Sequence, residues 1–544
     1  MVQETNSKKL SKQLELQHPN RFWFIALLIA VLFDQIFWDK TPGLLLLLTT
    51  LLILSGGFVL LIGEKKHIPW QSYLLLLPIL FSAAMTCFRL ESLTNVTNVL
   101  LTFFALFTLG ITVLNGEWLI YRMRDYALAF LRLLLSVIID PIRLAISSFR
   151  KAADKPAAEK TSFFKHILPY LRGVLIAAPL LLLLGALLAA ADPIFSNRIT
   201  NIFAWFKIED FGEYIFRTIY VLILAYALLG AYLHALTQSA DKQVLDKDKP
   251  LFQPFLGKVE ALIVLISVNL LFAAFVIIQF RYFFGGEANI SYEGFTYSEY
   301  ARRGFFELIA VALISLLIFY GLSMITRRQN KSERRIFSTL GILLMLQVGV
   351  MLFSAFQRLS LYESMYGFTQ LRTITHIFMV WLAILLAATV LLEAINRLPR
   401  LALVIFLVII GFSLTLNLIN MDGFIAKQNI QRAADGHKLD TNYLGWDLSG
   451  DAVPAMFKLY LAGELPDEVH DELGAVLACR SVYIDRPAED LSWVSYHFSK
   501  AATADLYREN ASKLEKYSLT KTDDGWYVEF NGERRSCFFD YYID

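Results

Sequence analysis

Apolar residues follow one another along most of this chain in runs of about 20, and polar segments separate the runs. A helix of about 20 residues crosses the hydrocarbon core of a bilayer, where backbone groups must form their hydrogen bonds within the segment. The pattern therefore predicts about eleven transmembrane helices, with ends defined to within several residues. They are expected near residues 22–38, 43–62, 70–88, 95–114, 173–191, 214–236, 259–280, 304–325, 336–356, 373–392 and 401–420.

Beyond Met421 the apolar runs end, and acidic residues outnumber basic ones. Helical periodicity comes first, and three alternating runs follow, separated by the hairpin-type turns Asp524-Gly525 and Asn531-Gly532. The helices are expected at 451–465, at 466–479 and over much of 488–517. The predicted fold class is an all-α polytopic membrane protein with a small C-terminal α+β soluble domain, which at roughly 120 residues has the usual domain size.

Lysine and arginine gather in every second loop, and the positive-inside rule places these loops in the cytoplasm. The basic loops hold Lys65 and Lys66, six residues from Arg143 to Lys165, three from Lys242 to Lys249, five from Arg327 to Arg335, and Arg397 with Arg400. An odd number of spans then places the C-terminal domain outside. The expected parts are a cytoplasmic tail (1–21), a four-span N-terminal unit (22–114), a cytoplasmic amphipathic helix and linker (115–172), a seven-span main membrane domain (173–420) and an extracytoplasmic α+β domain (421–544).

Residues 118–139 are apolar enough to suggest a further span, but Arg122, Arg124, Asp125 and Arg132 interrupt them. An arginine at the bilayer centre costs about 2.5–3.5 kcal/mol on insertion scales. We therefore expect an amphipathic helix that lies on the inner leaflet.

Composition supports a membrane protein. Hydrophobic residues make up 56% of the 544-residue chain and charged residues 18%, against about 25% charged residues in soluble proteins. The net charge of +2 does not favour nucleic acid as a partner. About twenty polar residues precede the first apolar run, so a cleaved signal peptide is not expected. No cofactor or metal is expected, because the three cysteines form no Cys-x-x-Cys motif.

Two cysteines, Cys479 and Cys537, lie in the expected outer domain, and Cys87 lies in a span. An oxidising outer face allows a disulfide between the first two. Two buried free thiols are the alternative, because the sequence gives no distance between them. Cα atoms more than about 7 Å apart would exclude the bridge.

The common catalytic motifs are missing from the sequence. It contains no Gly-x-Ser-x-Gly, no His-Glu-x-x-His and no Gly-rich phosphate loop ending in Lys-Ser/Thr. This favours a protein that is not an enzyme and leaves open an enzyme with an unfamiliar site. A membrane-embedded transferase acting on a lipid-linked substrate is one alternative, since Asp34 and Asp39 precede the second span. The loop at 39–42 is short for a donor-lipid site.

The segment 295–308 is predicted to form a capped helix at the outer end of the eighth span. Thr296 and Glu299 have the spacing of a capping box. Glu307 then falls just below the outer interface, where a carboxylate facing lipid is costly. A cationic partner is therefore expected, either Arg303 or an arginine of a neighbouring span.

Several cationic residues share the outer ends of the spans, where the positive-inside rule disfavours them. The candidate ligand-binding residues at this level are Arg217, Arg281, Arg302, Arg303, Glu307, Arg358, Arg372 and His376. One interpretation is internal ion pairing with snorkelling to headgroups, which i,i+4 pairs make easy. The other is an outward-facing polar cavity that binds an anionic ligand or lipid phosphate, which suits the guanidinium fork. For His376, a packing role competes with a proton-relay role.

These observations favour an integral membrane protein that binds or senses an anionic ligand or lipid. A secondary transporter is the alternative, because Pro78 and Pro179 interrupt spans as in transporter helices, although no internal repeat is evident. The expected partners are the lipid bilayer and a lipid headgroup or anionic solute.

Two stretches resemble a known family. They are Gly294-Phe-Thr-Tyr-Ser-Glu-Tyr-Ala-Arg-Arg-Gly-Phe-Phe-Glu-Leu308, and Asp440-Thr-Asn-Tyr-Leu444 followed by Leu448-Ser-Gly-Asp-Ala-Val-Pro454. From about Phe164 to Cys479 the chain resembles the bacterial multi-pass membrane proteins of the domain of unknown function 4173 family, which is related to the 4153 family. The resemblance implies a multi-pass protein of the bacterial cytoplasmic (inner) membrane, and it implies no activity.

Overall fold

The computed structural model describes residues 16–40, 43–153, 208–240, 254–283, 305–328, 330–484, 493–523 and 525–537. The chain divides into two compact units, and the division passes through two of its helices. The first unit comprises residues 1–38, 51–68 and 129–241, and the second comprises residues 39–50, 69–128 and 242–544. Helices form the described part of the first unit, and the second unit adds a small sheet.

Nine helices of the described residues are long and apolar enough to cross a membrane. They are α2 (Pro19–Phe37), α3 (Leu45–Gly63), α6 (Ser92–Thr112), α10 (Ile208–Thr237), α11 (Lys258–Phe283), α14 (Phe305–Ile325), α15 (Lys331–Tyr366), α16 (Gln370–Ala394) and α17 (Leu401–Ile419). Each coincides with a predicted apolar run, which confirms a multi-pass membrane protein. The predicted span at 173–191 lies outside the described residues.

The predicted span at 70–88 is interrupted. It forms two shorter helices, α4 (Trp70–Leu74) and α5 (Leu76–Met85). Pro78 has no N–H to donate to the Leu74 carbonyl, so the regular i→i−4 bonding fails at this point.

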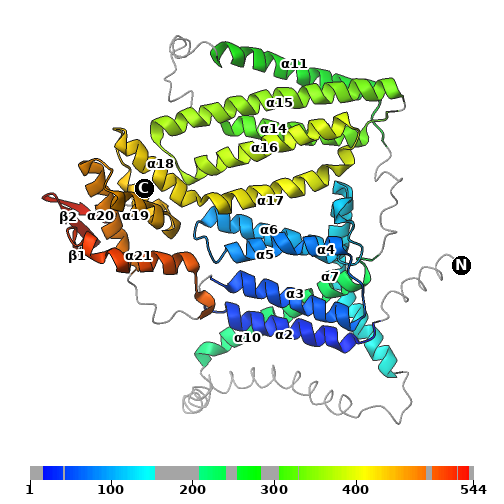
Figure 1. Ribbon diagram of the computed structural model, residues 1–544. Helices are drawn as coiled ribbons and strands as arrows, with labels where there is room; N and C mark the ends of the chain where they lie inside the picture. Colours follow the sequence, from blue (N-terminus) through cyan, green and yellow to red (C-terminus); the bar gives the residue numbers. More distant parts are fainter. Residues whose placement is uncertain are drawn as a thin grey trace, which may run out of the picture. The chain divides into compact units, whose positions relative to one another are not determined.

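Residues 118–139 contribute to a 3-10 turn, η2 (Glu117–Leu119), and to the long helix α7 (Met123–Ala153), which is not among the nine apolar helices. Apolar side chains form an exposed stripe along α7, at Leu131, Leu135, Ile138, Ile142 and Ile146. This part of α7 runs across the direction of α2 and α10 (Figure 1). These features fit the amphipathic helix that the sequence predicts.

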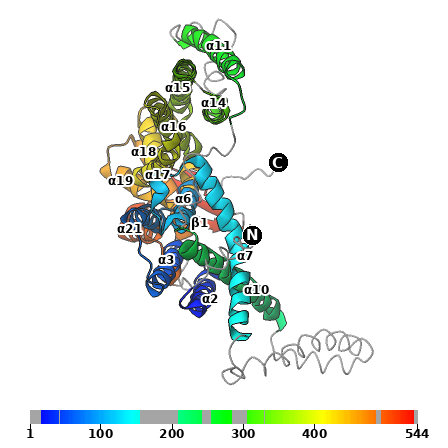
Figure 2. The same ribbon diagram turned by 90° about the vertical axis from the view of Figure 1, so that its right-hand side faces the viewer.

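In the first unit, α10 lies along α2 and contacts α7 (Figure 2). The His234 ring of α10 places its Nδ1 atom 3.0 Å from the Ser136 hydroxyl of α7. Gly230 allows this close approach, because a Cβ atom there would meet the backbone of Val137.

Helix α15 is the centre of the membrane part of the second unit. It packs against α11, α14 and α16, and α16 packs against α17 (Figure 1). Four fully buried positions at helical spacing, Leu344, Val348, Ala355 and Leu359, form the middle of this core. At a rise of about 1.5 Å per residue, the 36 residues of α15 extend roughly 54 Å, well beyond the hydrocarbon thickness of about 30 Å. Its ends therefore lie at or beyond the membrane boundary.

The C-terminal part of the second unit confirms the predicted α+β domain. Its elements are α18 (Met421–Ala434), the π-helical turn η6 (Tyr443–Asp447), the 3-10 turn η7 (Gly450–Ala452), α19 (Val453–Ala462), α20 (Asp467–Ile484), α21 (Phe498–Leu514), β1 (Ser518–Thr522), β2 (Gly525–Phe530) and β3 (Glu533–Ser536). The strands form an antiparallel meander in the order β1-β2-β3. Asn531 and Gly532 both have positive φ, as a two-residue hairpin turn requires.

Candidate functional site

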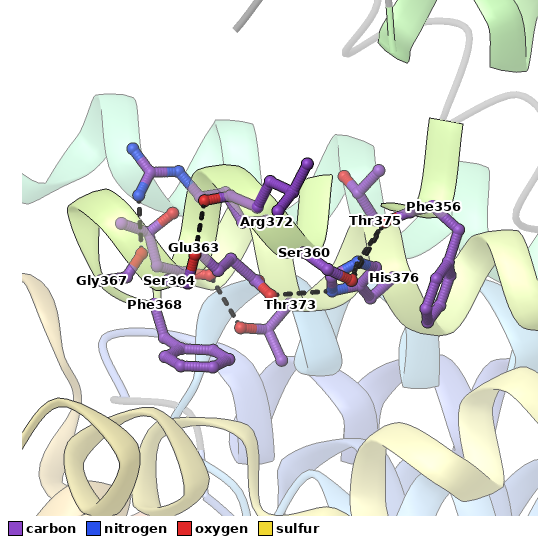
Figure 3. Close-up of polar contacts among 12 residues, drawn as sticks. Phe356, Ser360, Glu363, Ser364, Gly367, Phe368, Arg372, Thr373, Thr375 and His376 are labelled. Carbon is purple, nitrogen blue, oxygen red and sulfur yellow. Dashed lines mark hydrogen bonds and ion pairs between the residues drawn. The ribbon is translucent and has the colours of Figure 1, made fainter. Parts of the chain in front are cut away.

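A polar cluster forms where α15 ends and α16 begins. Helix α15 ends because Gly367, with φ of 81°, adopts a conformation that favours glycine, while its N–H still bonds the Glu363 carbonyl at 2.8 Å. Thr369 is the N-cap of α16, so the connection is very short. The two helices therefore run back along each other, and residues of the last turns of α15 face the first turns of α16 (Figure 3).

Glu363 and His376 form a buried carboxylate–imidazole pair across this hairpin. The Glu363 side chain is 4% exposed, and its Oε2 atom lies 2.9 Å from His376 Nδ1 (Figure 3). The other ring nitrogen, Nε2, lies 3.2 Å from the Phe356 carbonyl and 3.3 Å from the Ser360 hydroxyl. The second Glu363 oxygen, Oε1, has no hydrogen-bond partner among the described residues.

These contacts engage both ring nitrogens of His376. In one tautomer, Nδ1–H donates to the Glu363 carboxylate and Nε2 accepts from the Ser360 hydroxyl. The ring is therefore held in position between the two helices.

Arg372 lies beside the pair in the first turn of α16. Its Nη1 atom donates to the Gly367 carbonyl at 2.7 Å (Figure 3). Its guanidinium also stacks on the Tyr362 ring, 4.1 Å from the ring centre. Arg432 of α18 donates to two further carbonyls at the end of α15, those of Ser364 and Met365. Both arginines thus satisfy carbonyls at a helix C-terminus, where cations are favourable. For Arg372 this uses one of five N–H donors.

Arg217 lies in the other unit and has its own partner. Its Nη2 and Nε atoms bind the two carboxylate oxygens of Asp34 at 2.6 and 3.1 Å, and Tyr220 also donates to this carboxylate. The Trp38 ring lies 5.1 Å from the guanidinium. This bidentate pair joins α10 to α2 and explains why both charges sit in apolar helices. Asp34 therefore has a structural partner here.

The remaining predicted site residues are less well placed. Thr296, Glu299, Arg302 and Arg303 lie outside the described residues, as does the side chain of Arg281. Glu307 is exposed on α14, and no ion pair joins it to a described residue. Arg358 is half-buried on α15, one turn before Tyr362.

A largely apolar cavity of about 570 Å³ lies against the middle of α15 and α16, away from the hairpin that carries the polar cluster. Its polar point is Gln279 of α11, whose side-chain oxygen accepts from the Ser354 hydroxyl at 2.5 Å. Because these two polar groups are hydrogen-bonded to each other, the cavity presents a mainly hydrophobic lining. No cluster of three or more metal-ligating side chains occurs in the described parts of the chain.

The second resembling stretch, residues 440–454, has a structural role that the sequence did not reveal. The Arg480 guanidinium donates to the Leu444, Gly445, Leu448 and Ser449 carbonyls at 2.7–3.1 Å. Burial lowers the pKa of Arg480. The stretch is thus wrapped around one arginine.

Asp451 of the same stretch is buried and binds the start of α6. Its carboxylate accepts from the backbone N–H groups of Leu90 and Glu91 at 2.6 and 3.2 Å, and Ser499 also donates to it. Nearby, Asn98 and Asn417 exchange side-chain hydrogen bonds between α6 and α17. These contacts tie the C-terminal domain to the membrane helices of its unit.

Comparison with known proteins gives one match. A family described as a domain of unknown function (4153) matches residues 75–459. No curated protein and no solved structure matches the chain significantly. The matched residues include α15, α16 and residues 440–454. Since the match covers well over half of the sequence, the chain belongs to the domain of unknown function 4153 family of proteins.

Proposed function

We propose that this membrane protein binds an anionic ligand, a lipid phosphate or an anionic solute, at the Glu363–His376 site. The observation that supports the proposal is the Arg372 guanidinium beside the buried Glu363–His376 pair at the end of a membrane helix. Its bond to the Gly367 carbonyl uses one of its five N–H donors. Ionisable groups in such helices are costly, and they commonly mark functional sites.

The charges around the site favour one added anion. Arg372 and His376 are four residues apart on α16 and are therefore neighbours on one face. Arg372 and the Glu363 carboxylate balance each other at the hairpin. Any further cation at this end of α15 therefore leaves a net positive charge, which a bound anion can offset.

Two further features act in the same direction. Arg372 lies in the first turn of α16, where the helix macrodipole favours an anion, and the N-cap residue Thr369 makes no side-chain cap. Arg432 and the half-buried Arg358 add positive charge to this end of α15.

Titration of the purified full chain with sulfate and with octyl sulfate tests the proposal, because the two probes share an anionic group and only one has an alkyl tail. Arg372→Gln should weaken binding about 10- to 100-fold, since a charge-assisted hydrogen bond contributes about 1.5–3 kcal/mol. The matched control is Arg335→Gln, because Arg335 is an exposed arginine at the opposite end of α15. Equal losses in both variants would reduce the effect to general electrostatics and contradict the site.

Proton-coupled transport of the same anion is a second candidate. The interrupted helix at α4 and α5 favours it, because broken spans are common in secondary transporters. Uptake of radiolabelled sulfate by reconstituted vesicles, driven by a pH gradient, tests it. Binding without uptake would contradict transport and leave anion binding as the proposed function.

We further propose the orientation that the basic loops predict, with residues 1–21 in the cytoplasm of a bacterium and residues 421–544 outside its cytoplasmic membrane. A disulfide between Cys479 and Cys537, with Cα atoms 5.4 Å apart, supports this, because disulfides persist in oxidising compartments. Protease added to intact spheroplasts should then remove the C-terminal domain. Protection of this domain, while a periplasmic control is cut, would contradict the orientation. Residues 294–308 support the finer assignment to the 4173 family.

A further inference from the structure

A second cavity, of about 440 Å³, lies at the other end of the same helices. The end of α14, the start of α15 and the end of α16 form its walls, and the segment before α7 closes another side. Four arginines line it, namely Arg122, Arg124, Arg328 and Arg334. The volume falls within the roughly 300–1,000 Å³ of small-molecule pockets.

Arg328 is held in a fixed position in this cavity. Its Nη2 atom donates to the Ser323 carbonyl at 2.6 Å and to the Ser323 hydroxyl at 2.9 Å. Its guanidinium lies 4.6 Å from the Phe337 ring, and its Nη1 atom is 3.9 Å from Glu393. Such a preorganised guanidinium loses little freedom when a ligand binds.

The charges in the cavity are not balanced. Four guanidinium groups and one carboxylate, that of Glu393, line the cavity, and Arg124 also pairs with Asp125 at 3.2 Å. No ion pair joins Arg122 or Arg334 to another described residue. Among the described residues, two positive charges therefore remain in excess.

The surroundings of Arg328 also shift its pKa. Burial lowers its pKa, Glu393 opposes this shift, and Arg334 adds to it. An anion among the guanidinium groups would offset the cost of holding these cations close together.

We propose that this cavity binds a phosphate group, with Arg122 and Arg334 supplying the free guanidinium forks and Arg328 the fixed one. Arginine forks match phosphate oxygens in pairs, and four of them around one hollow suit a dianionic group. Met324 and Leu398 add apolar surface to the lining, so a phosphate that carries an apolar part also fits.

Two sources of phosphate share this chemistry, a phospholipid headgroup and a free phosphate or phosphorylated solute. The experiment therefore uses two probes on the full chain in neutral detergent, inorganic phosphate and a short-chain phosphatidic acid. The test variant is Arg122→Gln with Arg334→Gln. The control is Arg132→Gln with Arg335→Gln, which removes the same charge from two exposed arginines outside the cavity.

The test variant should weaken binding of the probe about 10- to 100-fold, and the control should change it less than threefold. Binding of phosphatidic acid alone identifies a lipid headgroup site, and binding of both probes identifies a phosphate site open to solutes. Equal weakening in test and control, or no binding at millimolar probe, would overturn the proposal. A loss that follows Arg372→Gln instead would assign the phosphate to the Glu363–His376 site.

A measurement on the unmodified protein guards against misfolded variants. Phenylglyoxal modifies accessible arginines, and peptide mass spectrometry reports each one. Inorganic phosphate or phosphatidic acid should protect Arg122 and Arg334 and leave Arg335 unprotected. Uniform modification with and without probe would also overturn the proposal.

Discussion

Replacing Glu363 with glutamine should strengthen anion binding at the proposed site. In the native protein, the buried Glu363 carboxylate lies beside Arg372 and opposes an added anion (Figure 3). Glutamine keeps the shape of the side chain and removes its charge. Arg372 then attracts the anion without an opposing carboxylate.

The magnitude follows from Coulomb repulsion. Like charges about 6–8 Å apart repel by roughly 2–3 kcal/mol at an effective dielectric constant of about 20. Removing the carboxylate should therefore lower the dissociation constant of the anion about 10- to 100-fold. Replacing a charge-assisted hydrogen bond at 2.9 Å by a neutral one should cost about 1–2 kcal/mol of stability, so the variant should still fold.

Titration calorimetry with octyl sulfate measures the dissociation constant directly. Glu307→Gln is the matched control, because Glu307 is exposed on α14 with no ion pair to a described residue. An affinity that is unchanged or weaker in Glu363→Gln would refute the reasoning.

Three further predictions concern the C-terminal domain. Serine at both Cys479 and Cys537 should lower its unfolding free energy by about 4 kcal/mol, because the bridge closes a loop across 58 residues; maleimide labelling of the unreduced, denatured chain should find one thiol and not three. Arg480→Met should cost about 3 kcal/mol or more in chemical denaturation, since four carbonyls lose their donor, and exposed Lys458→Met should cost little. A hydrogen bond from Lys516 lowers the pKa of Asp471, so Asp471→Asn should reduce stability at neutral pH by about 0.5–1 kcal/mol. That difference should disappear as the pH falls below about 4, the unfolded value, through the lower folded one; a constant difference would contradict it.

The membrane helices could be predicted because the bilayer imposes both their length and their internal hydrogen bonding. The apolar run near 336–356 identified α15, but the helix continues to Tyr366. Its last turns carry Arg358 and Glu363, and such charges end an apolar run without ending a helix. The acidic member of the candidate pair was therefore missed, although His376 was found.

Contacts between distant segments could not be predicted from these patterns. Arg217 was recognised as a cation at the end of a span, but its partner Asp34 is 183 residues away. Helix α18 was also missed, because it follows α17 after one residue, Asn420, with φ of 52°. A helix so short and polar shows no apolar run, and its buried face became evident only from its packing in the domain.

Residues 440–454 also help to position the start of α16. The Tyr443 hydroxyl accepts from the Gln370 backbone N–H at 2.8 Å, and the Gln370 side chain donates to Asp422 at 2.8 Å. Asp422 in turn accepts from the Ser449 N–H at 2.6 Å, and burial raises its pKa. This chain of bonds fixes the first turn of α16, two residues before Arg372. The C-terminal domain therefore positions the guanidinium of the proposed anion site, which gives a physical reason for a soluble domain to be joined to these membrane helices.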